Sequence, residues 1–362
     1  MKEKNTPFIL ALSAHEKIGG QTIKKILAVF SDLEKAWRLG ETAISQSLGP
    51  KIAGLFLEAR SRFSPAQEIE RLQKLNIGYL TLYDKVYPPL LAEIPDAPAI
   101  LYLRGDAAAL KATGISIVGS RKYTHYGRRV VGELTRQCVG ADLSIVSGLA
   151  LGIDGEAHRV ALKSAGTTVA VLGCGLDRVY PGSHLSLARE IIDSGGAVVS
   201  EFPPGTPAYP SNFPARNRII AGLTLGTLVI EAGEESGSLI TALAALEYNR
   251  EVFAVPGPID SPYSKGTNLL IQKGAKLVMS IEDILEELPV QLKEAQVKAR
   301  EILPETAEES VILALLSSGE QAVDNLVLES KLNIIAINTA LTMLEMKGMI
   351  ENIGGGRYRK IS

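Results

Sequence analysis

Cysteine and histidine are scarce in this sequence, which argues against several kinds of site. The 362 residues include two cysteines, Cys138 and Cys174, which lie far apart and form no CxxC pair. The four histidines, at positions 15, 125, 158 and 184, do not follow metal-ligand spacing. We therefore expect no disulfide framework, no metal centre and no bound cofactor.

Long apolar runs are also missing. The apolar stretch near the start of the chain is broken by Ser13, His15 and Glu16, and no continuous run approaches the length of a membrane span. We therefore expect a cytoplasmic protein without membrane contact. The formal net charge is −2, so any nucleic-acid binding must come from local basic patches. A chain of 362 residues predicts two or three domains.

The first segment, residues 1–75, predicts helices only. Apolar residues such as Ile23, Ile26 and Phe30 recur at helical spacing, and the pairs Gly19-Gly20 and Gly49-Pro50 each stand just before a predicted helix. Glycine-introduced helix pairs indicate a helix-hairpin-helix or sterile-alpha-motif-like bundle. Two roles stay open for it: contact with a phosphate backbone, or packing and partner docking.

The second segment, residues 76–288, alternates short apolar stretches with glycine loops and amphipathic helices. Strands that are apolar on both faces are typical of a parallel sheet covered by helices on each side. The pattern predicts an α/β fold, a Rossmann-like doubly wound and mainly parallel sheet, whose ligands bind beyond the carboxyl ends of the strands. The predicted strands cover residues 115–119, 143–148, 168–175, 197–202, 227–233 and 252–257.

The last part of the chain predicts a linker followed by a small domain. Residues 289–307 are rich in Lys, Glu and Gln, and residues 308–362 predict three helices and a β-ribbon, which is a winged helix. The third helix contains no arginine, while the ribbon carries Arg357, Arg359 and Lys360. This favours protein docking or weak backbone contact over sequence-specific DNA binding.

A basic loop follows the first strand of the predicted sheet. Residues 114–131 contain four Lys/Arg and no Asp/Glu, and Gly119, Ser120 and Arg121 stand between the strand and a predicted helix. Unpaired backbone N–H groups at a helix start, with a guanidinium beside them, suit a phosphate. No GxGxxG occurs, which argues against a bound dinucleotide. A plain turn between strand and helix would explain the glycine equally well.

A second basic motif lies at residues 211–220. The sequence predicts an exposed Phe213 beside Asn212, and Arg216, Asn217 and Arg218 directly before an apolar helix. Guanidinium groups bind phosphates and an aromatic ring stacks on bases, so the motif suits a single strand. The alternative is that these side chains hold a loop against the sheet.

A third motif, residues 231–242, ends a strand at Glu231 and turns through Gly233 into a helix. Ser238 is a candidate cap for that helix, and Gly237 would let a phosphate approach its N-terminus. The alternative is that Gly233 is needed only for the turn.

Several carboxylates, including Asp154, Glu156 and Glu201, are expected near the same edge of the sheet. Asp154 precedes a predicted helix and is expected to cap it. No Ser/His/Asp set, metal constellation or Walker lysine is found, so we expect no catalytic site and no enzyme.

These motifs resemble those of the DNA-processing protein A family (DprA, also called Smf). The similarity covers about residues 75–285 and runs, in one order, through IVGSR, VSGLALGIDGEAH, AVLGCGLDRVYP, SEFPPGTP, NFPARNRIIAGL, EAGEESGSLITA and VPGPIDSPYSKGTNLLIQKGA. The helical segment before this region and the winged helix after it resemble arrangements in the same family.

The resemblance implies a non-enzymatic recombination mediator of natural transformation. Such a protein binds and protects incoming single-stranded DNA, loads the RecA recombinase and forms a homodimer through the Rossmann-like domain. Taken together with the motifs above, the predicted DNA-binding residues are Gly119, Ser120, Arg121, Ser147, Gly148, Arg178, Asn212, Phe213, Arg216, Asn217, Arg218, Gly237 and Ser238.

One departure from the family pattern concerns a phosphate contact. After Tyr180-Pro181, many members carry a lysine and then an asparagine, where this chain has Gly182, Ser183 and His184. One phosphate contact thus lacks its usual residue, and Arg178 or Arg189 are candidate replacements.

The strand-end glycines also resemble the lysine-decarboxylase-like group of Rossmann-like enzymes. Members of that group cleave nucleoside monophosphates and carry a PGGxGT-type loop, where this chain has EAGEESGS. A nucleotide-binding or nucleoside-monophosphate-cleaving enzyme is therefore the alternative hypothesis.

Overall fold

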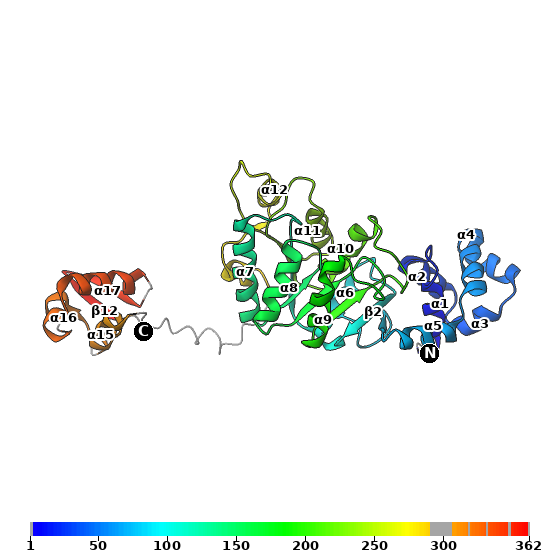
Figure 1. The fold of residues 1–362 in the computed structure, drawn as a ribbon, viewed down its shortest axis with the longest axis horizontal. Helices are drawn as coiled ribbons and strands as arrows, with labels where there is room; N and C mark the ends of the chain where they lie inside the picture. Colours follow the sequence, from blue (N-terminus) through cyan, green and yellow to red (C-terminus); the bar gives the residue numbers. More distant parts are fainter. Residues whose placement is uncertain (1–2, 290–305, 318, 331, 347–348, 361–362) are drawn as a thin grey trace. The chain divides into compact units, whose positions relative to one another are not determined.

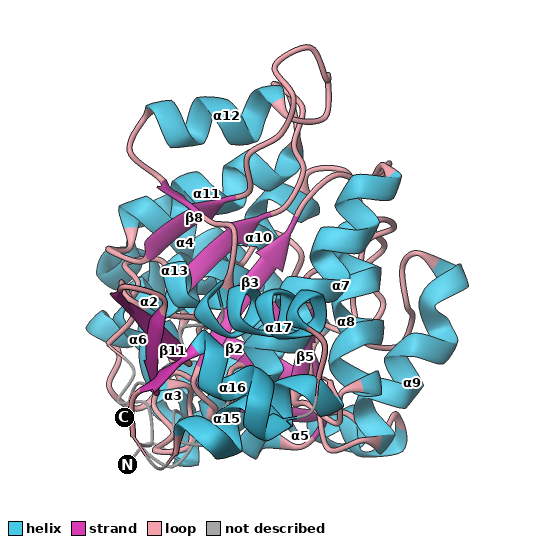
Figure 2. Cartoon of the chain, turned by 90° about the vertical axis from the view of Figure 1, so that its left-hand side faces the viewer, coloured by secondary structure: helices cyan, strands magenta, loops and turns pink. Residues whose placement is uncertain are grey.

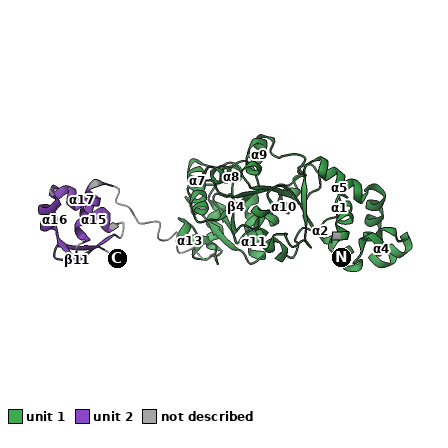
Figure 3. Ribbon diagram, turned by 90° about the horizontal axis from the view of Figure 1, so that it is seen from below, with its two compact units in different colours: residues 1–290 green, residues 291–362 purple. Residues whose placement is uncertain are grey.

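The computed structural model describes residues 3–289, 306–317, 319–330, 332–346 and 349–360. The chain divides into two compact units, residues 1–290 and residues 291–362 (Figure 1, Figure 3). The predicted boundary at residue 75 lies inside the first unit. Most of the predicted linker, residues 289–307, lies outside the described residues.

The first unit opens with a bundle of helices, as predicted. Gly19 is the N-cap residue of the second α-helix. Gly49, with φ 73°, interrupts the fourth, so a helical segment follows each of the two glycine motifs. The elements are η1 (Glu3–Asn5), α1 (Thr6–Ser13), α2 (Gly20–Val29), α3 (Leu33–Arg38), α4 (Glu41–Arg62) and α5 (Pro65–Lys74).

These N-terminal helices share a hydrophobic core with the sheet that follows. Ile9 and Leu12 of α1 are buried in the same cluster as Tyr102 and Leu172 of the sheet region. The Ser13 hydroxyl lies 2.6 Å from the buried Tyr102 hydroxyl. The bundle is therefore packed against the sheet as part of one unit.

The sheet within residues 3–289 has nine strands in the order β1-β2-β6-β5-β4-β3-β7-β8-β9. Strands β3 to β9 pair in parallel with one another, and β2 pairs antiparallel with both β1 and β6. The doubly wound, mainly parallel prediction is confirmed, and all six predicted strands are present. The strands are β1 (Gly78–Thr81), β2 (Ile100–Gly105), β3 (Gly114–Val118), β4 (Ser144–Ser147), β5 (Thr168–Val171), β6 (Ala197–Ser200), β7 (Gly226–Val229), β8 (Glu251–Ala254) and β9 (Lys276–Leu277).

Helices cover both faces of this sheet (Figure 2). One face packs on α7, α8 and α13, whose buried residues cluster with Ile115 and Ile117 of β3. The other face packs on α6, α10 and α11, together with Val118 and Val229. Burial on both sides explains why the strands are apolar throughout. The helices are α6 (Pro89–Glu93), η2 (Ala107–Lys111), α7 (His125–Gly140), α8 (Ile153–Lys163), η3 (Gly182–His184), α9 (Leu185–Asp193), α10 (Asn212–Gly222), α11 (Gly237–Glu247), α12 (Lys265–Gln272) and α13 (Ile281–Leu285).

Strand order reverses at β3, which has β4 on one side and β7 on the other. The chain leaves β3 through α7 and leaves β7 through α11. Loops that diverge in this way open a crevice between the carboxyl ends of the two strands, where doubly wound sheets bind their ligands. Gly119 and Glu231 lie beside this switch point.

The second unit has the helices and ribbon of a winged helix, which confirms that prediction. Its core includes Ile312, Leu326 and Ile337, and in the wing Arg357 pairs with Glu320 while Arg359 pairs with Glu351. The two wing arginines thus have acidic partners. The elements are α15 (Ala307–Leu316), β10 (Gln321–Ala322), α16 (Val323–Ser330), α17 (Ile334–Met346), β11 (Ile350–Gly354) and β12 (Arg357–Lys360).

Among the described residues, no single helix has the length and apolar composition needed to cross a membrane. Two helices joined by a sharp bend, Val323–Ser330 and Ile334–Glu345, are long and apolar enough only when they are counted together.

Candidate nucleic-acid interface

A cavity of about 570 Å³ lies at the carboxyl ends of the strands; we call it the switch-point cleft. It is lined from β3, from the loop after β5, and from the first turns of α10 and α11. A smaller adjoining cavity adds Gly148 and Pro181. Seven of the thirteen predicted contact residues line the cleft itself: Gly119, Arg121, Phe213, Arg216, Asn217, Gly237 and Ser238.

One wall of the cleft is a stack of two rings and a guanidinium. The Arg121 guanidinium carbon lies 5.4 Å from the centre of the Phe213 ring. The Tyr180 ring centre lies 5.4 Å from that of Phe213, with 38° between the planes. Tyr180 is 48% exposed. Rings that stack on bases contribute about 1–3 kcal/mol per base, so this wall can hold a single strand.

Sequence reasoning missed Tyr180 and misplaced Phe213. Tyr180 belongs to the loop after β5, and the signal that could have found it is its position in the quoted family motif DRVYP. Phe213 is half-buried rather than exposed. Helix α10 begins at Asn212, so its first turn lays the ring over the loop after β5, where a Cβ on Gly173 would come within 3.0 Å of it.

Arg216 forms part of the cleft floor. The prediction that it precedes the helix is wrong, because it lies inside α10, and its side chain is 4% exposed. Its Nη1 donates to the carbonyl of Gly148 at 2.7 Å and also to that of Val171, and its Nε donates to Asn217 Oδ1. The pKa of Arg216 is lowered to about 10, mainly by burial; the charge of Asp154 opposes this lowering and that of Arg121 adds to it. The residue is still protonated at neutral pH and supplies a fixed positive charge.

Asp154 faces the same floor. The expectation that it caps its helix is wrong: Gly152 is the N-cap residue of α8, and Asp154 lies in the first turn with 6% exposure. Its Oδ2 accepts from the N–H of Gly148 at 3.1 Å. Burial raises the pKa of Asp154, and the charge of Arg216 opposes that rise. The Gly148 peptide is therefore held by both charged side chains.

Glycine is required at position 148, because a Cβ there would lie 2.6 Å from Arg216 Nη2. The neighbouring predicted residue, Ser147, is fully buried, and its hydroxyl donates to the Ile117 carbonyl at 2.6 Å. In this structure the two residues join β3, β4 and α10 beneath the cleft.

The N-terminus of α7 is occupied by a carboxylate of the protein itself. Glu231, 3% exposed at the end of β7, accepts from the N–H and from the hydroxyl of Thr124 at 2.9 and 2.5 Å. The Thr124 hydroxyl oxygen in turn accepts from the N–H of Gly127, and the N–H of Ser120 donates to the Glu231 carbonyl. The N–H groups of Ser120, Thr124 and Gly127 thus have partners within the protein, which the sequence did not predict. The Arg121 side chain, which is exposed, is what this loop offers a phosphate.

The N-terminus of α11 is open by comparison. Its N-cap residue is Ser236 rather than the predicted Ser238, because the Ser236 hydroxyl oxygen accepts from the N–H of Ser238 at 3.4 Å. A Cβ on Gly237 would meet nothing within 4 Å. A helix N-terminus with free space beside its first residue suits an anion, so the phosphate approach at Gly237 stays a prediction.

Asn212, Arg218 and Arg178 are three of the six predicted residues that do not line the switch-point cleft. Asn212 donates to the carbonyls of Gly173 and Pro207. Arg218 is paired with two carboxylates, those of Glu201 and Asp96. Arg178 is 46% exposed at its side chain and pairs with the adjacent Asp177 at 3.1 Å.

The family departure after Pro181 places a buried histidine where a phosphate contact was expected. His184 is 4% exposed, with Nδ1 at 2.9 Å from the Leu149 carbonyl and Nε2 at 3.0 Å from Arg159. Both ring nitrogens therefore have partners within the protein. Arg189 is exposed on α9.

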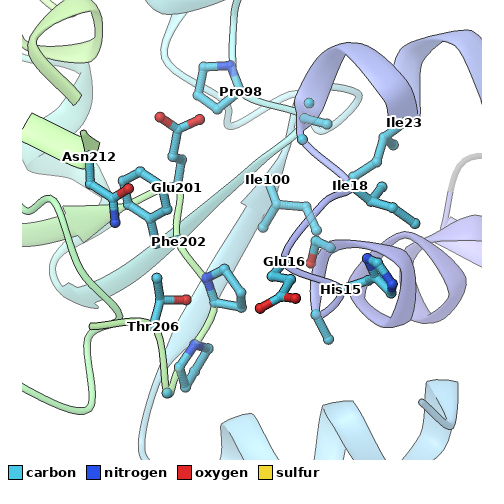
Figure 4. Close-up of a pocket in the computed structure, with 18 of the residues that line it drawn as sticks. His15, Glu16, Ile18, Ile23, Pro98, Ile100, Glu201, Phe202, Thr206 and Asn212 are labelled. Carbon is cyan, nitrogen blue, oxygen red and sulfur yellow. The ribbon is translucent and has the colours of Figure 1, made fainter. Parts of the chain in front are cut away.

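A second cavity of about 420 Å³ lies between the N-terminal helices and the sheet (Figure 4). Its lining includes the carboxylates of Glu16 and Glu201, and its arginine, Arg71, donates to the Pro204 carbonyl. Residues 207–214 form the wall between the two cavities, since Tyr209 and Asn212 line this one while Pro210 and Phe213 line the cleft. The acidic lining makes this cavity less suited to phosphate than the cleft.

Comparison with known proteins gives the family. Residues 78–289 match the family described as "DNA recombination-mediator protein A", and residues 296–356 match the "DprA winged helix domain". The chain belongs to the DprA family. Among its DprA relatives, Protein Smf of Escherichia coli (strain K12) is 39% identical over 326 residues, covering 84% of this chain and 85% of the relative. The DNA processing protein DprA of Streptococcus pneumoniae (strain R6) is 41% identical, covering 74% and 93%.

Solved DprA structures share the fold. The DprA structure from Streptococcus pneumoniae matches with a TM-score of 0.69 and 38% identity, over 78% of this chain and 97% of that one. The DprA structure from Helicobacter pylori matches with a TM-score of 0.53 and 30% identity, over 59% and 96%. That structure is described as giving insight into a single-stranded DNA binding mode.

Proposed function

We propose that the chain binds single-stranded DNA in the switch-point cleft. The observation that carries the proposal is the stack of Arg121, Phe213 and Tyr180, which puts a phosphate-binding cation against two base-stacking rings. The buried charge of Arg216 and the open N-terminus of α11 add attraction for phosphates. The single-stranded DNA binding described for the Helicobacter pylori relative supports the same assignment.

Binding to oligonucleotides across a salt series tests the proposal. Arg121→Ala should weaken binding about tenfold for any sequence and flatten the slope of log K against log salt by about 0.7, because one phosphate contact is lost. Lys111→Ala removes an exposed charge before the amino end of β3 and serves as the matched control. Unchanged affinity and slope for a folded Arg121→Ala variant would contradict the proposal.

Phe213→Ala separates stacking from charge. It should lower the affinity by about 1–3 kcal/mol per base stacked and leave the salt slope nearly unchanged. Loss of the fold, measured by thermal unfolding, would instead assign Phe213 to packing.

We further propose that the chain protects incoming DNA and loads RecA in natural transformation, acting as a cytoplasmic homodimer. This extension rests on the family resemblance. RecA assembly on DNA coated with a single-strand-binding protein should speed up when the chain is added, and should not when Arg121→Ala is added. Nuclease digestion measures protection, and sedimentation measures the oligomer. Equal RecA assembly with and without the chain would contradict the loading role.

We also propose that the chain is not an enzyme. The carboxylates at the strand ends have structural partners: Glu231 holds Thr124, Asp154 holds Gly148 and Glu201 pairs with Arg218. Incubation with nucleoside monophosphates should release no free base. Release of a base that Asp154→Asn abolishes would favour the alternative, a nucleotide-cleaving enzyme.

A further inference from the structure

A basic groove of about 500 Å³ lies between α7 and α8, two helices that run side by side on one face of the sheet (Figure 1). Its lining on α7 includes His125, Arg128, Arg129 and Arg136, and on α8 it includes Lys163. None of these residues lines the switch-point cleft, although His125, Arg128 and Arg129 belong to the basic stretch of residues 114–131. We call this feature the α7/α8 groove.

The α7 residues of the groove form one continuous stripe. His125, Arg128, Arg129, Gly132 and Arg136 follow the three- and four-residue spacing that keeps side chains on one face of a helix. From His125 to Arg136 the helix rises about 17 Å, which is about five nucleotides of a stacked strand at 3.4 Å each.

The charge of the stripe is largely available to a ligand. Arg129 and Lys163 are exposed and have no ion pair within the described residues. Arg136 pairs with Glu133, and both side chains are more than half exposed. Arg128 lies 3.9 Å from Glu156 with its side chain 64% exposed. Exposed ion pairs are weak, so an incoming polyanion can replace them.

Gly132 keeps the middle of the groove open. Glycine inside a helix is less stable than alanine, so a buried one calls for a reason. A Cβ at this position would meet Arg136 Nη2 at 3.6 Å and no other heavy atom within 4 Å, which is ordinary contact. Packing does not require the glycine, whereas an open groove does benefit from it.

The groove begins close in sequence to the switch-point cleft. Arg121 lines the cleft and His125 lines the groove. The four residue-to-residue steps from Arg121 to His125 span at most about 14 Å. The aromatic ring nearest the groove along α7, that of Tyr126, has the Arg129 guanidinium over it at 5.9 Å. The groove therefore offers cations rather than stacking rings.

We propose that a single strand leaving the switch-point cleft continues along the α7/α8 groove, which binds its phosphates without reading its bases. This inference rests on the proposed function. The short stretch of chain between Arg121 of the cleft and His125 of the groove favours the same DNA strand over an acidic protein surface as the occupant. A strand long enough to fill the cleft and reach the groove should therefore bind more tightly than a strand that fills the cleft alone.

Two lengths of oligothymidine, about 6 and about 20 nucleotides, separate the cleft from the groove. The double variant Arg129→Gln/Lys163→Gln should bind the short strand like the parent protein. For the long strand its affinity should fall about tenfold or more at low salt, with the salt slope reduced by about 1.4 for two lost contacts. Lys111→Gln/Lys273→Gln removes two exposed charges from other parts of the first unit and should leave binding of both lengths unchanged.

Gly132→Glu is a second, independent test, because it places a carboxylate in the middle of the groove. It should weaken binding of the long strand and spare the short one, while thermal unfolding shows an intact fold. Parental binding of the long strand by both variants would overturn the inference, even if Arg121→Ala weakens both lengths. The Arg121→Ala variant tests the cleft separately. If it binds both lengths like the parent protein, the proposal that the cleft binds DNA is contradicted.

Discussion

Two helices begin beside the switch point, and they treat their N-terminal N–H groups differently. At α7, the Glu231 carboxylate accepts from Thr124, and Gly127 lies against that carboxylate. At α11, the hydroxyl of Ser236 caps the helix, and the space beside Gly237 is open. Both follow the pattern of strand, glycine loop and helix, yet one carries its own anion and the other can receive one.

The difference shows that a glycine-rich helix start does not by itself define a phosphate site. Glu231 and Thr124 are 107 residues apart and meet because β7 is the neighbour of β3 in the sheet. Strand order, rather than the local motif, decides which helix start is filled. Three substitutions test this contrast.

Removing the internal anion should have the largest effect. Glu231→Ala leaves the N–H of Thr124 without its acceptor and empties a buried site, so the free energy of unfolding should fall by about 3 kcal/mol. Chemical denaturation measures the loss. Glu234→Ala, on the exposed part of the same loop, is the control and should change stability by less than about 0.5 kcal/mol. Equal stability of the two variants would mean that Glu231 does not hold α7.

A methyl group at the filled helix start should have the next largest effect. In Gly127→Ala the new Cβ would lie 2.2 Å from Glu231 Oε2, so the carboxylate or the helix must shift. Overpacking of this kind costs about 2 kcal/mol. Thermal unfolding gives the value, and a fully stable variant would show that the carboxylate can move aside freely.

The same methyl group at the open helix start should barely affect the fold. Gly237→Ala meets no atom within 4 Å, so stability should stay within about 0.5 kcal/mol of the parent. Its affinity for a single strand should fall by less than about 1 kcal/mol, because a phosphate can approach the helix less closely. Binding equal to that of the parent would place the strand away from α11.

The fold could be predicted where apolar residues fill whole strands. Strands β3 to β8 are buried on both faces, which leaves a continuous apolar run in the sequence. The short β9 and β10 were not predicted, since two residues leave no pattern. No pattern in residues 100–105 predicts that β2 pairs antiparallel with β6.

The site could be predicted as far as strand ends and helix starts determine it. Gly119, Arg121 and Gly237 meet in one cleft because parallel strands end at one edge of the sheet. Which arginines are engaged could not be predicted, since Arg218 pairs with Asp96 and Glu201 from other parts of the chain. The RecA assignment came from the family resemblance and from no pattern of charge or spacing.

The core that the N-terminal helices share with the sheet has a consequence for how the molecule comes apart. Tyr102 and Leu172 are covered on one side by α1 and its neighbours, so a chain cut at residue 75 would expose a hydrophobic face. The helices and the sheet should therefore melt as one cooperative block. Deleting residues 1–75 would therefore lower solubility before it revealed their role. Point substitutions on the outer surface of these helices are the better test of that role.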